Sequence, residues 1–412
     1  MGCCDAPGLM PISDAIDQML LTTKTLPDVE SLDISNAVGR ILSTPVQSPL
    51  NVPPFDNSAM DGYAVRTSDF DSQSNLPLAG QSFAGHPFTG HWETGTCIRI
   101  MTGAQIPAGC DAVVMQEDVT TTEQGLVSFD SKAIKRGQNI RLKGNDIAIG
   151  STVFNSGHKL TLRDLPILAS LGIATVSVFQ KVKVAIFSTG DEIKSLDEPL
   201  KAGEIYDSNR YGLIPMFEKF GAEVIDLGII VDDKTAIKET FDKAQQCADI
   251  VITSGGVSVG EADYTKDILE EMGEIGFWKI AIKPGKPFAF GQLPNAFFCG
   301  LPGNPVSAAI TAHVLVEPFL AKMSGHSEWK PDVTLNAKSL SAFKKRPGRT
   351  DYQRGIYRVD NGEVVVESCA NQSSGAFMSM SIANCYVILE QDRGSVTKEE
   401  TVTIQPFGAT LL

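Results

Sequence analysis

The segment spanning about residues 181–325 constrains the fold most, because short apolar runs typical of strands alternate in it with runs of helical periodicity. The expected elements, in chain order, are a strand at 182–187, a helix at 209–220, a strand at 223–230, a helix at 234–247, a strand at 249–253 and a helix at 264–272. Strand-like runs follow at 276–282, 287–291 and 296–299. This alternation predicts a doubly wound α/β domain, with a parallel sheet covered by helices on both faces.

A glycine-rich turn follows the expected strand at 249–253. Gly255 and Gly256 let the backbone approach a ligand closely, and Asp263 stands just before the next expected helix. Free amides and the positive end of a helix dipole near glycines attract anions. The turn differs from a Walker P-loop and from G-x-G-x-x-G, so an ordinary strand-to-helix turn is an equally good reading of the spacing alone.

Other polar residues also follow expected strands. Glu192 comes after the first strand of the α/β segment, and the turn at 301–307 ends in Asn304, a good N-cap, and Pro305, which suits a first helical turn. Ligands of such sheets bind at the carboxyl ends of the strands. One crevice is therefore expected to collect these residues together with Gly255 and Gly256.

The rest of the chain has β character. Residues 47–142 hold short β-like runs with little helical periodicity, and they are flanked by short helical patterns at 12–21 and 162–171. Alternation at 362–367 and 385–390 predicts a small C-terminal β-barrel.

Composition narrows the class of protein. A chain of 412 residues with a net charge of -14 predicts two to four domains and argues against a general nucleic-acid binder. Six basic residues against one acid between Ser341 and Arg358 indicate either a focused anion site or a solvated basic segment. Eight cysteines without metal-ligand spacing fit a reducing cytoplasm. We expect no membrane segment, because we read no apolar run as approaching the necessary length.

Six ordered motifs resemble those of the molybdopterin molybdenumtransferase family, known as MoeA. They cover residues 53–64, 98–104, 187–192, 250–264, 279–287 and 301–307, and the similarity extends from about residue 10 to the C-terminus. The resemblance implies a multidomain α/β and β architecture. Its expected parts are an extended linking domain at 1–46 and 143–180, a β-rich inserted domain at 47–142, a molybdopterin-binding α/β domain at 181–326 and a C-terminal barrel at 327–412.

The resemblance also implies an activity. The expected protein is a cytoplasmic, Mg²⁺-dependent transferase that inserts molybdenum from molybdate into adenylylated molybdopterin and releases AMP. It would work as a homodimer with a composite active site and make transient contacts with other cofactor-biosynthesis enzymes. Two alternatives stay open: adenylylation of molybdopterin, disfavoured by the extra domains, and a scaffold role, disfavoured by the intact motifs.

Several acids match active-site positions of the family, although acids beside turns commonly cap helices. Asp61, Thr102, Asp146 and Glu192 are expected to be catalytic, with Glu192 and Asp61 as Mg²⁺ ligands, because a hard cation reconciles carboxylates with phosphates. The capping alternative is strong for Asp232 and Asp263, which are expected substrate-binding residues. The resemblance further implies that Asp61, Thr102 and Asp146 act on the partner subunit's site.

Basic and hydroxyl residues complete the expected substrate site. Lys279 and Lys283 lie four apart on one expected strand and would share a face, about 13 Å apart at ~3.3 Å per residue. Oxyanions and phosphates are expected to bind Lys283, Lys286, Ser307, Arg349, Arg354 and Ser374. The alternatives are surface charges for the lysines and ordinary turn bonding for the serines.

Overall fold

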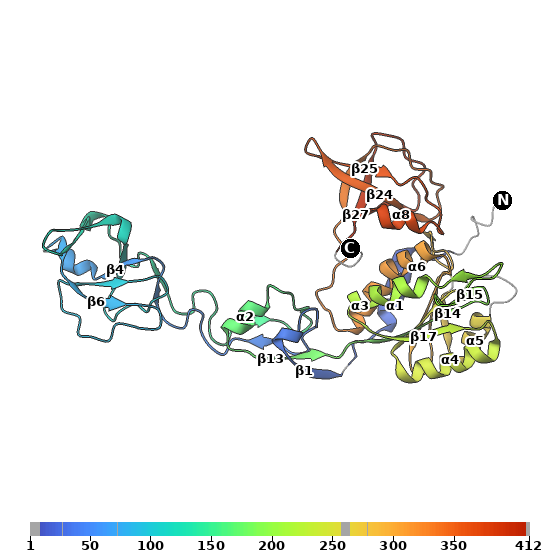
Figure 1. Cartoon of the computed structure of the whole chain (residues 1–412), viewed down its shortest axis with the longest axis horizontal. Helices are drawn as coiled ribbons and strands as arrows, with labels where there is room; N and C mark the ends of the chain where they lie inside the picture. The colour runs from blue at the N-terminus through green and yellow to red at the C-terminus, as the bar shows by residue number, and fades with distance from the viewer. Residues whose placement is uncertain (1–8, 27, 72, 257–263, 278, 409–412) are drawn as a thin grey trace.

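The computed structural model describes residues 9–408 apart from 27, 72, 257–263 and 278. The molecule is elongated, with the β-rich part around β4 and β6 at one end, a narrow segment around β1, β13 and α2 in the middle, and the α/β domain with the C-terminal barrel at the other end (Figure 1). The multidomain α/β and β architecture expected from the sequence is therefore confirmed.

The α/β domain is built on a six-stranded sheet with the order β17-β14-β18-β22-β21-β19. The four strands from β17 to β22 are parallel, whereas β21 pairs antiparallel with β22 and β19 pairs antiparallel with β21 at one edge. Their bounds are β14 Lys183–Thr189, β17 Glu223–Ile230, β18 Ile250–Ser254, β19 Glu274–Phe277, β21 Ala289–Gln292 and β22 Phe297–Leu301. The doubly wound sheet is confirmed, with a mixed edge in place of an all-parallel one.

Helices cover both faces of this sheet, as expected. One face packs against α1 Ile12–Thr22, α3 Asn209–Lys219, α6 Pro305–Thr311 and α7 Glu317–Met323, and the other against α4 Lys234–Cys247 and α5 Tyr264–Met272. Ala15 and Met19 of α1 are fully buried in the first of these cores. The N-terminal helix, grouped with the linking segments by the resemblance, thus packs on the α/β domain.

One helical stretch of this domain has the composition of a membrane span. Pro305–Met323 has a mean hydropathy of 1.3 over a suitable length, so the expectation that no run approaches that length is wrong. Yet 78% of the stretch is buried inside the protein, as in the core helix of a globular domain.

The expectation of one strand over residues 276–282 is also wrong. Strand β19 ends at Phe277, Ile280 forms a parallel bridge with Met10, and β20, Ile282–Lys283, pairs with β24 of the C-terminal barrel. The apolar pattern identified an extended backbone, but three different partners divide it.

The C-terminal part is a closed five-stranded barrel, in which the ring β24-β25-β23-β27-β26 closes by pairing of β24 with β26. Its elements are β23 Leu335–Ser339, β24 Thr350–Asp360, β25 Glu363–Ser368, α8 Phe377–Ile382, β26 Cys385–Leu389 and β27 Thr401–Pro406. Because β20 joins this sheet beside β24, the barrel is tied directly to the α/β domain.

The inserted part has two small sheets. The first has the order β6-β7-β4-β8 and the second β5-β10-β9. The bounds are β4 Gly62–Val65, β5 Asn75–Leu76, β6 Leu78–Ser82, β7 Cys97–Ile100, β8 Ala112–Met115, β9 Val119–Thr121 and β10 Val127–Phe129; β3 Asn57–Ser58 pairs separately with β11 Ile140–Arg141.

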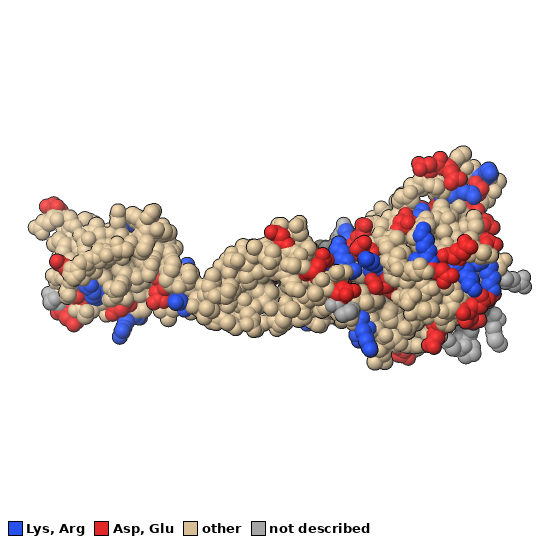
Figure 2. All heavy atoms as spheres, turned by 90° about the horizontal axis from the view of Figure 1, so that it is seen from below, with Lys and Arg blue, Asp and Glu red and all other residues tan. Residues whose placement is uncertain are grey.

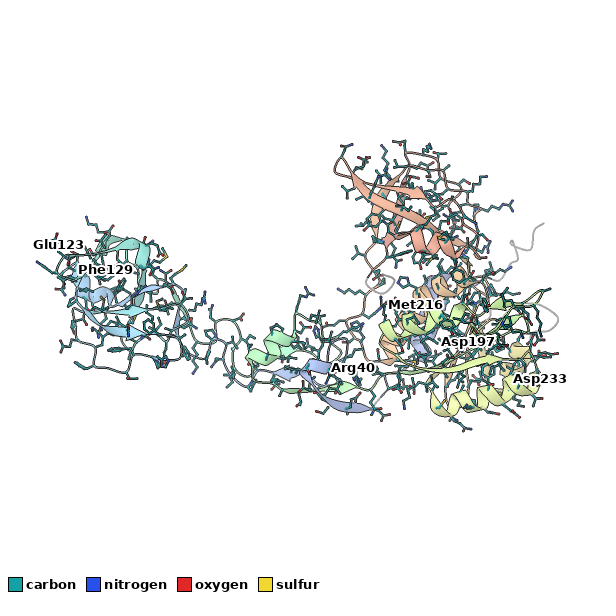
Figure 3. All side chains as sticks on the ribbon, viewed as in Figure 1. Arg40, Glu123, Phe129, Asp197, Met216 and Asp233 are labelled. Atoms are coloured by element: carbon teal, nitrogen blue, oxygen red, sulfur yellow. The ribbon has the colours of Figure 1, made fainter. Side chains whose placement is uncertain are left out.

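Between these bodies lies the narrow linking segment. It contains β1 Val29–Asp33 antiparallel to β13 Thr175–Phe179, β2 Val46–Gln47 paired with β12 Thr152–Phe154, and α2 Leu165–Ser170. Figure 3 shows Phe129 in the inserted part, Arg40 in the linking segment and Met216 in the α/β domain, well separated along the molecule. The cores around these residues are therefore distinct.

Candidate active site

A cavity of about 780 Å³ lies where β14, β18 and β22 end. Its lining includes four residues expected from the sequence, namely Glu192, Asp232, Gly255 and Gly256. For Glu192, Gly255 and Gly256, together with Asn304 of the 301–307 turn, the sequence predicted one shared crevice, because parallel strands bring their carboxyl ends to one edge.

Glycine is required at both turn positions. Gly255 and Gly256 have φ of +93° and +66°, and a Cβ on Gly255 would lie 2.9 Å from the carbonyl oxygen of Thr189. A Cβ on Gly256 would lie 2.7 Å from the hydroxyl oxygens of Thr189 and Thr265. The amide of Gly255 already donates to the Leu301 carbonyl at 3.1 Å, so the turn bonds to the neighbouring strand through this group.

Asp232 of this cavity lies near two other acids, Asp191 and Glu192. Burial, followed by the charges of Asp191 and Glu192, raises the pKa of the Asp232 carboxyl above its ordinary value. The Asp232 amide also donates to Asp191 Oδ1 at 3.2 Å. A carboxylate held among other carboxylates is stabilised by a bound cation.

A second cavity of about 800 Å³ adjoins the first, because Pro287, Pro302 and Asn304 line both. Its lining includes all six residues expected to bind oxyanions and phosphates, namely Lys283, Lys286, Ser307, Arg349, Arg354 and Ser374. Together the two cavities form one groove, with acids and the glycine turn at one end and basic and hydroxyl groups at the other. We call this the substrate groove.

Arg354 is buried, and it serves the loop that carries Ser374. Its Nη2 donates to the Ser373 carbonyl at 3.0 Å and to the Asn371 carbonyl at 3.3 Å, while Nε donates to Ser379 Oγ at 3.1 Å. Burial lowers the pKa of this guanidinium. The sequence indicated a fork for oxyanion oxygens, but three of its described bonds position the 371–379 segment.

A third, basic cavity of about 600 Å³ shares Lys283, Lys344 and Arg349 with the second. Lys345 also lines it, and its buried ammonium donates to the carbonyls of Arg346, Gln391 and Arg393. Burial lowers the pKa of Lys345. The basic run between Ser341 and Arg358 was the sequence signal for this region, although Lys344 and Arg346 were not singled out as site residues.

Asn209 lines the groove but was not among the site residues predicted from the sequence. Its Nδ2 donates to Ser254 Oγ at 2.7 Å and to the Gly303 carbonyl at 2.8 Å, joining the ends of β18 and β22 to the start of α3 at the groove. A polar residue opening a helix after a strand was the available signal.

Several expected residues are not brought to the groove. Lys279 is exposed outside the three cavities, and its carbonyl accepts from the Met10 amide at 3.2 Å. Because the expected common strand with Lys283 does not exist, the inferred spacing of these lysines on one face is withdrawn. Asp263 lies outside the described residues.

Asp61, Thr102 and Asp146 belong to the opposite end of the chain. Asp61 Oδ1 accepts from the Thr102 amide and hydroxyl, both at 2.7 Å, and these bonds hold the pKa of Asp61 below its usual range. Asp146 is exposed, and its amide donates to the Val52 carbonyl at 3.0 Å. Within one chain the inserted part that carries Asp61 and Thr102 lies far from the α/β domain (Figure 1), and Asp146 follows it at the start of the linking segment.

Comparisons with known proteins agree with this architecture. Family models described as the MoeA N-terminal region (domain I and II), the probable molybdopterin binding domain and the MoeA C-terminal region (domain IV) match residues 10–172, 185–322 and 336–407. The chain therefore belongs to the MoeA family.

Individual relatives span nearly the whole chain. A molybdopterin molybdenumtransferase of Haemophilus influenzae is 50% identical over 97% of this chain and 98% of its own, and one of Nostoc is 36% identical over 93% and 90%. A crystal structure of the molybdopterin biosynthesis MoeA protein of Pyrococcus horikoshii, 30% identical, superposes with a TM-score of 0.83 over 97% of this chain and 100% of that one.

Proposed function

We propose that this protein is a transferase that inserts molybdenum from molybdate into adenylylated molybdopterin and releases AMP, within molybdenum cofactor biosynthesis. The substrate groove carries this proposal, because one continuous space joins a glycine turn with acids to a basic pocket with hydroxyl groups. The phosphates of a pterin nucleotide, with their magnesium ion, suit the end with the glycine turn and acids. A tetrahedral oxyanion suits the end with basic and hydroxyl groups.

The basic end suits molybdate. Ser307 is 3% exposed at the start of α6, and Ser374 and Arg349 line the same cavity. Hydroxyl donors and planar guanidinium forks match tetrahedral oxygens, and Lys283 and Lys286 add positive charge. These residues would hold the oxyanion in place for the dithiolene sulfurs.

The acid end suits a magnesium ion that arrives with phosphates. Among the described residues no three His, Cys, Asp or Glu side chains form a complete metal cage. Mg²⁺ usually binds through one or two carboxylates together with substrate phosphates. Glu192 and Asp232 line the cavity and would serve as such ligands, with Asp61 of the partner subunit as the expected further one. When bound, the ion would neutralise charge on the phosphoanhydride.

The proposed reaction balances without a covalent protein intermediate. Two molybdate oxygens take up four protons, two from the dithiol and two from solvent, and leave as two waters while the two sulfurs bind molybdenum. One water cleaves the phosphoanhydride, which separates AMP from the pterin phosphate. The protein contributes by holding both reactants in one groove and by excluding alternative geometries.

The proposed active form is a homodimer, with Asp61, Thr102 and Asp146 reaching the substrate groove of the partner subunit. Two observations support it: Asp61 and Thr102 are bonded to each other in a polar cluster with no groove of its own among the three cavities above, and they lie far from the groove of their own chain. Figure 2 shows few charged side chains on the visible face of the linking segment, as expected of a face that packs against protein.

The test supplies purified protein with adenylylated molybdopterin, Mg²⁺ and molybdate, and identifies the products by mass spectrometry. The proposal requires a molybdenum-loaded pterin and one AMP for each. Absence of both products would refute it. Formation of adenylylated molybdopterin from molybdopterin and Mg-ATP would instead assign the preceding step.

A further inference from the structure

Two exposed aromatic rings line the cavity that holds the glycine turn. Phe377 is 47% exposed and Tyr206 is 41% exposed, and both belong to the lining of the same 780 Å³ space. Among the other described Phe and Tyr residues only Phe55, at 37%, and Tyr211, at 58%, are exposed, and neither lines this cavity. Exposed aromatic rings that line a cavity indicate a binding surface more strongly than exposed rings elsewhere on the protein.

Tyr206 is held by the same ribbon that carries Glu192. It lies in β16, Ile205–Tyr206, which pairs in parallel with β15, Ile193–Lys194, and the Ile205 amide donates to the Glu192 carbonyl at 2.8 Å. The following residue, Asp207, is buried and bonded to Arg210 at 2.6 Å. This anchoring fixes the backbone that presents the Tyr206 ring.

Phe377 is presented from the other domain. It is the first residue of α8, and the loop before it is tied to α6 because the Val306 amide donates to the Ser374 carbonyl at 3.2 Å. The buried Arg354 side chain donates hydrogen bonds to the Ser373 carbonyl of this loop and to the Ser379 hydroxyl of α8. The ring is therefore pre-positioned at the groove, which lowers the entropy cost of binding a partner.

Apolar side chains of the same lining suit a planar ring, although Glu192, Asp207 and Asp232 also line the cavity. Apolar side chains of Ile193, Ile205, Pro302 and Pro305 share this lining, and the described lining residues include no Lys or Arg. The ring surface thus shares the first cavity with the acids and the glycine turn, while the basic residues line the second.

We propose that Phe377, with Tyr206 lining the same cavity, is the stacking surface for the fused heteroaromatic ring of the substrate, pterin or adenine. This inference rests on the proposed function and deepens it by assigning residues that recognise the ring. A flat heteroaromatic ring stacks on an aromatic side chain whatever its edge groups, while the acids and the glycine turn act on the phosphates.

The experiment measures binding by titration calorimetry on full-length protein with Mg²⁺ present. The probes are AMP, a 6-hydroxymethylpterin and ribose 5-phosphate, which carries the phosphate without a ring. We expect Phe377→Ala to weaken AMP, the pterin or both by about tenfold and to leave ribose 5-phosphate unchanged. The matched control is Met378→Ala, because Met378 is 73% exposed on the same helix but lines neither cavity of the groove.

A second readout separates stacking from a structural role. Phe377→Trp should retain binding, and stacking should quench the emission of the new indole when AMP or the pterin is added. Which probe responds identifies the ring. Equal weakening of all three probes in Phe377→Ala, no weakening of either ring, or no ring binding by the wild-type protein would each overturn the inference.

The two proposals fail differently. If ring binding depends on Phe377 but no molybdenum-loaded product forms, the proposed function falls and the stacking surface stands. If product forms with an unchanged KM in Phe377→Ala, the stacking surface falls and the function stands.

Discussion

Lys283 Nζ lies 2.8 Å from Asp351 Oδ2, and this bond joins β20 of the α/β domain to β24 of the barrel at the basic end of the substrate groove. The two side chains differ in environment, since that of Lys283 is 46% exposed and that of Asp351 is 2% exposed. The lysine thus compensates a buried carboxylate while it still lines the cavity.

This pair predicts that removing the lysine destabilises the fold. Lys283→Gln should lower the free energy of unfolding by about 1–2 kcal/mol, because the buried Asp351 carboxylate loses its charged partner. Denaturant unfolding measures the change, and Lys344→Gln, another lysine of the same cavity, should leave stability nearly unchanged. The double variant Lys283→Gln/Asp351→Asn should recover stability without recovering molybdate binding. Equal stability of the double variant and Lys283→Gln would contradict this account.

The glycine turn predicts a specific loss at Gly255. Gly255→Ala should destabilise the protein by about 1–3 kcal/mol and abolish AMP binding, because the new Cβ meets the Thr189 carbonyl in a backbone conformation that L-residues rarely adopt. Gly203→Ala is the matched control, since Gly203 has φ +89° with nothing within 4 Å. The control should cost backbone strain but keep AMP binding. Loss of binding in both variants would show a global effect.

The raised pKa of Asp232 predicts a stability effect that depends on magnesium. The folded protein holds a proton on Asp232 more readily than the unfolded chain, so this carboxyl lowers stability as the pH rises through its raised pKa. Asp232→Asn should therefore have a higher Tm than wild type at neutral pH in EDTA, with no such gain below the ordinary pKa of 3.8. Mg²⁺ with AMP should raise the Tm of wild type more than that of the variant; an equal rise would argue against Asp232 as a ligand.

His158 predicts a pH-dependent link between the linking segment and the chain after α7. Its ring nitrogens lie 2.9 Å from Glu328 and 3.0 Å from Asp164. Burial lowers the pKa of His158, but bonds and charges of the two acids outweigh burial and raise it above 6.5. The contribution of the protonated His158 ring to the free energy of unfolding is complete below pH 6.5 and is lost as the pH rises through the pKa of His158 in the folded protein. Differential scanning calorimetry should show a steeper fall of Tm above that pH in wild type than in His158→Gln.

The composite site predicts complementation between inactive subunits. Asp61→Ala and Glu192→Ala homodimers should both be inactive, whereas a verified heterodimer should regain activity at one of its two grooves. Molybdenum-loaded product is the readout. The control is a heterodimer of wild type with a chain that carries both substitutions. This heterodimer has one intact groove only if Asp61 acts within its own chain. No activity in verified heterodimers of two inactive variants would place Asp61 in the groove of its own chain.

Local patterns in the sequence were sufficient for most of the α/β domain. The expected bounds of β17, α4 and α5 match the structure residue for residue, because their apolar periodicity has a single interpretation. Strand polarity then placed Glu192, Gly255 and Gly256 at one edge of the sheet. Asn304 does precede α6, although its side chain makes no capping bond.

Other features depended on contacts with segments distant in the sequence, which a local pattern does not predict. Residues 276–282 read as one strand, but Met10 and β24 take parts of the run, so Lys279 and Lys283 separate. The sequence predicted Arg354 as an anion ligand, but its buried guanidinium donates to the carbonyls of Asn371 and Ser373 in the loop before α8. Phe377 carried no signal at all, since an exposed ring acquires meaning only from the cavity beside it.

The sequence by itself determined which faces of each helix and strand are apolar, where the glycine turn stands and which family the motifs resemble. Only the tertiary structure decided which distant segments cover those faces, that Lys283 compensates Asp351, and that two domains share one groove. The physical reason is that hydrophobic burial specifies that a surface must be covered, whereas packing and strand pairing across the whole chain select what covers it.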